Sequence, residues 1–307
     1  MSRVQRNQLL LLLTAAIWGT TFVAQESICG LAGPATFNCL RSIVAFVVML
    51  PFLKVLDRMG VTERIPRTGS EWYLLIKAGT IGGFFLTVAS LAQQLALYWG
   101  ASAGKAGFLT ACYIIIVPLL GSFTGRRCGW NVWLAVVLAL GGLFLLCIKE
   151  NSFFLQPADL MLLLCSFFFA VQIMIVDKYA PQVEGVRMSM VQFVLQVVIS
   201  AVPMILFESG TSAESISRWA APLFTPAFLG AMLYAAVFSS GIAYTLQIIG
   251  QQGVNPAVAS LLMSLESVFA VLAGWIFLGE TMTLRELLGC AVMFAAILLA
   301  QLPGRKF

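Results

Sequence analysis

The chain has 307 residues, of which 60% are hydrophobic and only 10% are charged, and its formal net charge is +5. Soluble domains carry about 25% charged residues, so this composition excludes a globule covered by polar surface and makes lipid the outer solvent. Histidine is absent and none of the seven cysteines forms a CxxC pair, which argues against zinc-type sites and against His-based acid–base catalysis.

Ten apolar runs are long enough to cross a hydrocarbon core of ~30 Å, which takes about 20 helical residues. The first run has no small-x-small cleavage site, so we interpret it as a retained transmembrane helix rather than a signal peptide. The two longest loops, 57–71 and 208–225, are far shorter than a domain. In chain order the predicted helices are 8–28, 34–56, 72–97, 103–123, 132–148, 157–176, 188–207, 226–249, 254–278 and 283–302.

The Lys and Arg residues predict the orientation of these helices, because cytoplasmic loops of membrane proteins are enriched in basic residues. With the N-terminus inside, 13 of the 18 fall in cytoplasmic segments. Three fall in outer segments (Lys149, Arg218 and Arg285), and Arg41 and Lys105 lie within predicted helices. The asymmetry predicts a multi-pass protein of the cell (inner or plasma) membrane with both termini cytoplasmic. It also accounts for the positive charge without a nucleic-acid partner.

The second half of the chain repeats the first. Five helices repeat five helices, and an odd number per unit turns the second copy upside down. The basic pair Arg126-Arg127 after the fourth helix, against Gly279-Glu280 after the ninth, agrees with this inversion. A shift of 153 residues places Gln94 on Gln247, Gly100 on Gly253, Ala106 on Ala259, Leu109 on Leu262, Leu119 on Leu272 and Gly121 on Gly274.

We therefore predict an all-α polytopic membrane protein with ten transmembrane helices arranged as two inverted five-helix repeats, residues 1–153 and 154–307. Inverted repeats recur in secondary transporters, whose substrate site lies near the bilayer midplane between the halves.

Four motifs together resemble the EamA-type members of the drug/metabolite transporter (DMT) superfamily. They are Trp18-Gly19-Thr20-Thr21-Phe22 in the first helix, Arg41 in the second, Tyr113 to Pro118 in the fourth, and Leu265 to Phe269 leading to Leu278-Gly279-Glu280 in the ninth. The resemblance implies a central cavity ringed by helices 1, 3, 4, 6, 8 and 9, and transport by alternating access. It also implies substrates such as amino acids and other metabolites, mostly exported. The chain departs from the family at Phe167–Ala170, where the second copy often has a tryptophan.

Glu266 is the first candidate for a functional side chain, because an ionisable group costs ~2.5–3.5 kcal/mol at the centre of a membrane helix. It lies near the middle of the ninth helix, and the 153-residue shift pairs it with Tyr113. Glu266 either contacts a cationic or amine group of a substrate or takes up a proton. The alternative is a structural carboxyl that holds helices together.

Lys105, Arg41 and Glu26 are the other ionisable residues within predicted helices. Lys105 lines the cavity, pairs with Glu266, or extends its long stem to the interface. For Arg41 we favour a structural role, neutralised by Glu26 at the outer end of the first helix, because a buried charge persists best when paired.

Uncharged polar residues complete the candidate cavity. A stripe in the first helix, spaced to share one face, is Thr14, Trp18, Thr21 and Gln25. The same polar theme continues with Gln94 in the third helix and with Tyr244 and Gln247 in the eighth. Packing between helices is the alternative role for such side chains.

The favoured function is a secondary transporter that exports an amino acid or a related metabolite by alternating access. The alternative is an integral membrane enzyme acting on a lipid or isoprenoid, which needs clustered catalytic groups that this sequence does not present. No glycine-rich segment ends in GK[ST], so ATP-driven transport is not supported. We predict no catalytic residue, metal or cofactor. The expected partners are a small-molecule substrate and the lipid bilayer, and the pattern fits a monomer or a homodimer.

Overall fold

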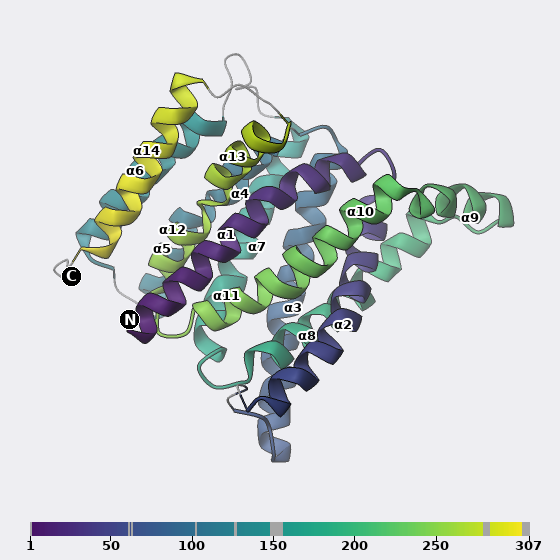
Figure 1. Ribbon diagram of the computed structural model, residues 1–307, viewed down its shortest axis with the longest axis horizontal. Helices are drawn as coiled ribbons and strands as arrows, with labels where there is room; N and C mark the ends of the chain where they lie inside the picture. Colours follow the sequence, from purple (N-terminus) through teal and green to yellow (C-terminus); the bar gives the residue numbers. More distant parts are fainter. Residues whose placement is uncertain are drawn as a thin grey trace.

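The computed structural model describes residues 2–60, 62, 64–101, 103–125, 128–147, 156–278 and 283–302, and this part of the chain is almost entirely helical (Figure 1). Within it, nine helices are long and apolar enough to cross a membrane, and Trp130–Leu146 is a shorter apolar helix. All ten predicted spans are thus present as helices. Lys149, the loops holding Arg126-Arg127 and Gly279-Glu280, and the last five residues lie outside the described residues.

The helices keep the order that the apolar runs predict. The first five spans are α1 (Arg3–Ile28), α2 (Pro34–Arg58), α3 (Gly69–Tyr98), α4 (Ala103–Ala111) with α5 (Tyr113–Phe123), and α6 (Trp130–Cys147). The second five are α7 (Pro157–Tyr179), α8 (Gly185–Pro203) with η1 (Met204–Glu208), α10 (Pro226–Tyr234) with η3 (Ala235–Tyr244) and α11 (Thr245–Gly250), α12 (Pro256–Met263) with α13 (Glu266–Leu278), and α14 (Leu284–Gln301).

Capping side chains place some helix ends at residues other than those that hydropathy predicts. The first helix begins at Arg3 rather than at residue 8, because Ser2 and Gln5 form a capping box. The predicted loop 208–225 contains the short helix α9 (Ala213–Ala220) followed by the 3-10 turn η2 (Ala221–Phe224). In α9 an exposed ion pair joins Arg218 to Glu214 at 2.9 Å.

Two spans are broken at the same place in the repeat. Cys112 separates α4 from α5, and Ser264-Leu265 separates α12 from α13. At each break the hydrogen bonds tighten from four residues to three: Cys112 N donates to Leu109 O, and Leu265 N donates to Leu262 O, each at 3.3 Å. Both donors and both acceptors are 153 residues apart. The break is therefore a property of the repeat, and sequence analysis, which predicts continuous spans here, was wrong on this point.

The eighth span widens in its middle, where η3 is a π-helix of 10 residues between α10 and α11. Such segments are uncommon and occur frequently at functional sites.

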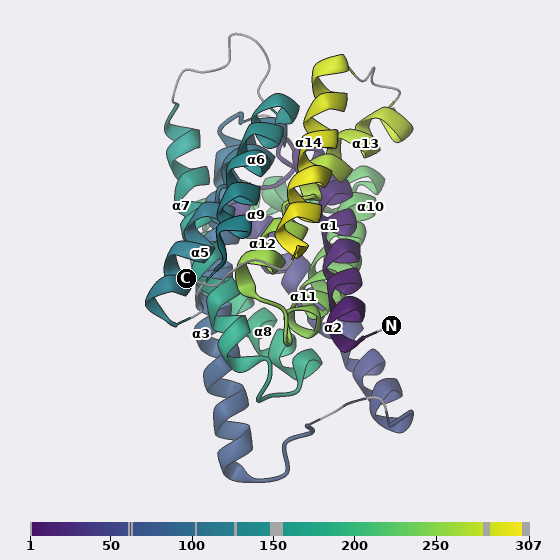
Figure 2. The same cartoon turned by 90° about the vertical axis from the view of Figure 1, so that its left-hand side faces the viewer.

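α6 and α14 pair at one side of the bundle and lie next to each other in both views (Figures 1 and 2). Glycine allows this close approach: a Cβ on Gly289 would lie 2.8 Å from Gly142 O and 2.9 Å from Leu146 N. Small residues at contact points are typical of membrane helix pairs.

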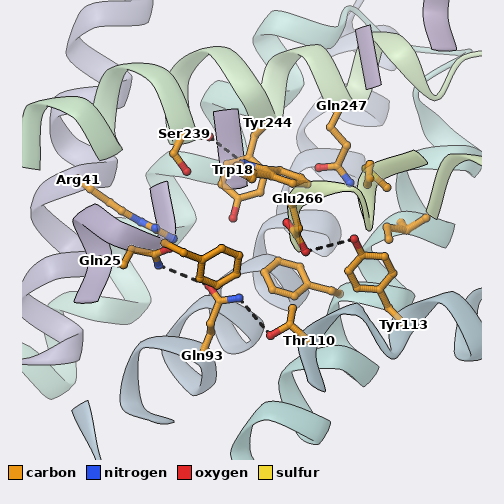
Figure 3. Close-up of a pocket in the computed structure, with 14 residues that line it drawn as sticks. Trp18, Gln25, Arg41, Gln93, Thr110, Tyr113, Ser239, Tyr244, Gln247 and Glu266 are labelled. Atoms are coloured by element: carbon orange, nitrogen blue, oxygen red, sulfur yellow. Dashed lines mark hydrogen bonds between the residues drawn. The ribbon is translucent and has the colours of Figure 1, made fainter. Parts of the chain in front are cut away.

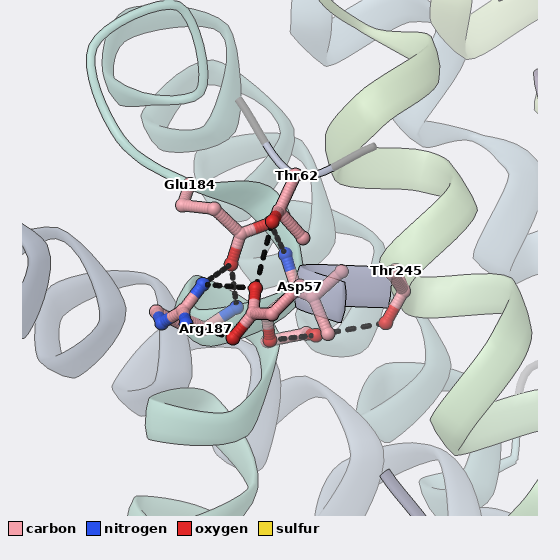
Figure 4. Close-up of polar contacts among 7 residues, drawn as sticks. Asp57, Thr62, Glu184, Arg187 and Thr245 are labelled. Carbon is pink, nitrogen blue, oxygen red and sulfur yellow. Dashed lines mark hydrogen bonds and ion pairs between the residues drawn. The ribbon is translucent and has the colours of Figure 1, made fainter. Parts of the chain in front are cut away.

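α2 and α8 connect the two halves through acidic residues at both of their ends. The carboxylate of Glu208 accepts hydrogen bonds from Ala35 N at 2.8 Å and Thr36 N at 2.7 Å, capping α2. At the opposite end Asp57 of α2 pairs with Arg187 of α8 at 2.6 Å, and Arg187 also contacts Glu184 at 3.3 Å (Figure 4). The C-terminal acid of each span therefore holds the N-terminus of the other, as an inverted repeat produces.

Candidate functional site

A pocket inside the bundle is lined by residues of seven spans (Figure 3). The resemblance implied helices 1, 3, 4, 6, 8 and 9. All six contribute, and α2 adds Arg41. The lining residues are Trp18, Phe22, Gln25, Arg41, Gln93, Thr110, Tyr113, Phe169, Ile173, Ser239, Tyr244, Gln247, Met263 and Glu266.

The two helix breaks bring Tyr113 and Glu266 together. Each is the first residue of the helix that follows a break, and the Tyr113 hydroxyl donates to Glu266 Oε1 at 3.3 Å (Figure 3). Both residues are buried, at 3% and 5% exposed. Discontinuous helices meeting between inverted repeats form the substrate and ion sites of many secondary transporters.

The π-helix η3 and α1 form the opposite wall. Trp18 Nε1 donates to the backbone oxygen of Ser239 at 3.3 Å. The indole ring also lies against Tyr244, with ring centroids 5.0 Å apart and planes tilted by 59°. An amphipathic aromatic pair held this way presents an apolar face with polar edges to a ligand.

Glutamines of α1 and α3, together with Thr110 of α4, form a polar network at the edge of the pocket. Gln25 Nε2 lies 3.2 Å from Gln94 Oε1 and 3.4 Å from Gln93 Oε1, and Gln93 donates to Thr110 at 3.3 Å. Gln94 lies behind the lining, where it holds Gln25 in place.

The second half has a corresponding glutamine pair, in which Gln247 Nε2 donates to Gln172 Oε1 at 3.0 Å. Gln25 and Gln93 line the pocket in the first half and Gln247 lines it in the second, whereas Gln94 and Gln172 are not part of the lining. Because the interior contains little water, such amides hold helices together as well as offering groups to a ligand.

Lys105 lies outside the pocket lining. Its Nζ pairs with Asp159 Oδ2 at 2.6 Å, joining α4 to α7, so the proposed partnership with Glu266 is wrong. The 153-residue shift matches Lys105 with neither Asp159 nor Glu266. The choice of Asp159 as its ion-pair partner therefore depends on how the helices pack. Thr21 also lies outside the lining: it is buried, and its hydroxyl donates to Ile17 O at 2.7 Å within the same helix.

Arg41 and Glu26 do not pair. Glu26 is exposed at the end of α1, whereas Arg41 is 2% exposed inside the bundle. No ion pair joins these two described residues. The guanidinium lies 5.1 Å from the centre of the Phe37 ring, and its other side borders the pocket.

The sequence analysis did not identify half of the residues that line the pocket. For some of them, the internal repeat relates a lining residue of the first half to one of the second half. Phe169 follows Trp18 by 151 residues, and Ile173 follows Phe22 by the same interval. Met263 likewise follows Thr110 by 153 residues. Transferring the candidate Trp18 to the second half would have found Phe169. Ile173 and Met263 follow in the same way only once Phe22 and Thr110 are known to line the pocket. Gln93 and Ser239 carry no such signal, nor does Phe22 itself beyond its place in the W-G-x-x-F motif.

The pocket is narrow: the centre of a water molecule can reach about 30 Å³ of it, which is room for a few ordered waters. A metabolite therefore enters only after helices or side chains move apart. Among the described residues, no group of three or more Cys, Asp or Glu residues is placed to hold a metal ion.

Known proteins match almost the whole chain. The model described as the EamA-like transporter family matches residues 6–148 and 156–302. The chain is 25% identical to an uncharacterized transporter of Archaeoglobus fulgidus, covering 95% of this chain and 84% of the other. It is also 25% identical to the uncharacterized transporter YwfM of Bacillus subtilis, covering 97% and 94%. One solved crystal structure shares the fold, with a TM-score of 0.74 at 18% identity over 97% of this chain and 96% of that one.

Proposed function

The chain belongs to the EamA-like transporter family, and we propose that it is a secondary transporter that moves a small metabolite by alternating access through the pocket. The observation that carries this proposal is the contact of Tyr113 with Glu266 at the two helix breaks. Opposite halves of the repeat supply its two members, so movement of one half against the other opens the pocket to either side. We further propose that the protein lies in the cell membrane with both termini cytoplasmic.

The substrate that we propose is an amino acid or a related compound, moved outward. Trp18, Phe22 and Phe169 offer apolar surface, while Gln25 and Glu266 offer hydrogen-bonding groups. A ligand that is apolar in its body and polar at its ends fits this lining.

A substrate screen tests the function directly. Purified protein is challenged with amino acids, amines, nucleosides and sugars in a thermal-shift assay, and each hit is followed by flux into proteoliposomes. Saturable flux of a stabilising compound supports the carrier and names its substrate class. If no polar metabolite binds and a lipid or isoprenoid is chemically converted instead, the protein is a membrane enzyme and the proposal fails.

Glu266→Gln distinguishes the two proposed roles of the carboxyl, and Glu26→Gln, which changes an exposed acid outside the pocket, is the matched control. The other titratable or charged groups lining the pocket are Tyr113, Tyr244 and Arg41. If Glu266 carries a proton, wild-type flux depends on pH and the Glu266→Gln variant loses coupled flux while still binding substrate. If Glu266 contacts an amine, the variant loses binding at every pH. Normal transport at all pH values would exclude both roles.

A further inference from the structure

Arg41 is a buried cation for which the described part of the protein supplies no anion. It lies in α2 at 2% exposure, none of its described neighbours forms an ion pair with it, and its Nε has no hydrogen-bond partner. A cation–π contact with Phe37 and a polar contact with the Tyr244 hydroxyl stabilise the guanidinium in part, and a cation–π contact contributes about 0.5–2 kcal/mol, but neither group supplies a negative charge. An uncompensated guanidinium among membrane helices is costly.

The acidic residues of the surrounding helices are engaged elsewhere. Asp159 pairs with Lys105, and Asp57 and Glu184 pair with Arg187 at one end of the bundle. Glu208 caps the N-terminus of α2, and Glu266 accepts from Tyr113 across the pocket. None of these acids forms an ion pair with Arg41.

The guanidinium instead borders the pocket. Figure 3 shows the Arg41 side chain extending inward, with Gln25 at its end and Tyr244 on the neighbouring wall. A guanidinium offers several N–H donors in a planar fork, which matches a carboxylate through two parallel hydrogen bonds. Gln25 and Tyr244 add polar groups, and Trp18 and Phe22 provide apolar surface beside them.

We infer that Arg41 binds the carboxylate of the transported metabolite and thereby determines specificity for acids over their uncharged analogues. The inference rests on the proposed function, because it places the substrate in the pocket. The carboxylate of the substrate neutralises the positive charge of Arg41. Glu266, on another wall of the pocket, then contacts a different part of the substrate. A small inorganic anion such as chloride shares this chemistry and must be distinguished from the substrate.

The experiment compares each carboxylate with its amide. A panel of amino acids and simple monocarboxylates, each paired with its amide, is tested for binding by thermal shift and for flux in proteoliposomes, with and without chloride. The variants are Arg41→Gln and Arg41→Lys. Arg187→Gln is the control, because it removes an arginine that is paired with acids outside the pocket.

We expect the wild type and Arg187→Gln to prefer the acid over its amide by at least about tenfold, since the amide leaves the guanidinium unpaired. Arg41→Gln brings the two affinities together by weakening the acid alone, and Arg41→Lys keeps part of the preference because it retains a point charge. If Arg41→Gln does not fold, the ratio of acid to amide in Arg41→Lys against wild type decides.

Three results would overturn the inference: a wild type without preference for acids, a preference that survives in the Arg41 variants, or equal weakening of acid and amide. Stabilisation by chloride alone would also contradict it. Failure of the proposed function looks different. Acids would then stabilise the protein in an Arg41-dependent way without being transported, whereas transport of amines or neutral compounds only would retain the carrier and refute the inference.

Discussion

At the scale of single residues, the lack of a side chain at Gly19 allows two walls of the pocket to pack closely. It follows Trp18 in α1 and packs directly on the start of α13. A Cβ placed on it would collide with Glu266 O, would lie 2.6 Å from Phe269 Cβ, and would lie 2.8 Å from Ala270 N. Two of these are backbone atoms, so they have no rotamer by which to move away. The absence of a side chain at this position lets Trp18 and Glu266 approach one pocket.

Gly19→Ala is therefore expected to destabilise the protein by about 1–3 kcal/mol, the usual range for overpacking, and to reduce flux by displacing Glu266. Thermal unfolding in detergent and proteoliposome flux measure the two effects. Gly230→Ala is the control, since nothing lies within 4 Å of the added carbon. Equal behaviour of the two variants would refute the packing argument.

The partners of ionisable residues were the least predictable feature at this scale. Lys105 and Arg41 stand out in the sequence because each interrupts an apolar run. Spacing along a helix gives the depth of such a residue only to about a turn, and it does not give the direction in which a neighbouring helix presents its own charge. The pairing of Lys105 with Asp159, and the lack of an ion pair between Arg41 and any acid in the described part of the chain, depend on that direction.

At the scale of helices, the interrupted spans distinguish this bundle from ten continuous rods. The segments on both sides of Cys112 and of Leu265 are apolar, so the apolar runs continue across the breaks and do not mark them. Pro118 lies within α5, after the first break. The three-residue hydrogen bonds at both breaks are visible only in the folded chain, although their repetition after 153 residues follows from the internal repeat.

The contact between α6 and α14 gives a second packing test, with a control on the same helix pair. Gly289→Ala should lower the melting temperature, because the added carbon meets Gly142 O and Leu146 N at 2.8 and 2.9 Å. Gly141→Ala should be neutral or slightly stabilising, since its added carbon meets nothing within 4 Å and alanine is the better helix former. Thermal unfolding of both variants checks the difference, and a destabilised Gly141→Ala would show that helix contacts do not explain it.

At the scale of the whole molecule, the inverted repeat appears as reciprocal contacts. α2 and α8 run past each other, with Glu208 holding the N-terminus of α2 and Asp57 holding Arg187 at the other end. The corresponding atoms are at opposite ends of the bundle, as an inversion requires. The same relation places Tyr113 and Glu266, one from each half, against each other.

Labelling of cysteines tests the proposed orientation. In a Cys29→Ser background, Ser70→Cys in the first turn of α3 should react with a membrane-impermeant maleimide only after cells are opened. Thr211→Cys, before α9, should react in intact cells. Both positions are exposed, so accessibility reflects the side of the membrane. The reverse pattern would place the termini outside, and labelling of both in intact cells would contradict the spans between them.

The sequence by itself determined that the protein crosses the membrane many times, with ten helices in two inverted halves, because lipid permits few polar residues along a span and an odd number of helices per repeat inverts the second copy. It also identified Trp18, Gln25, Tyr113, Tyr244, Gln247 and Glu266, which line the pocket. Only the tertiary structure decided the helix breaks, the π-helix, and the partners of Lys105 and Arg41. Those features depend on where neighbouring backbones and charges lie in three dimensions, and a continuous apolar run carries no information about that.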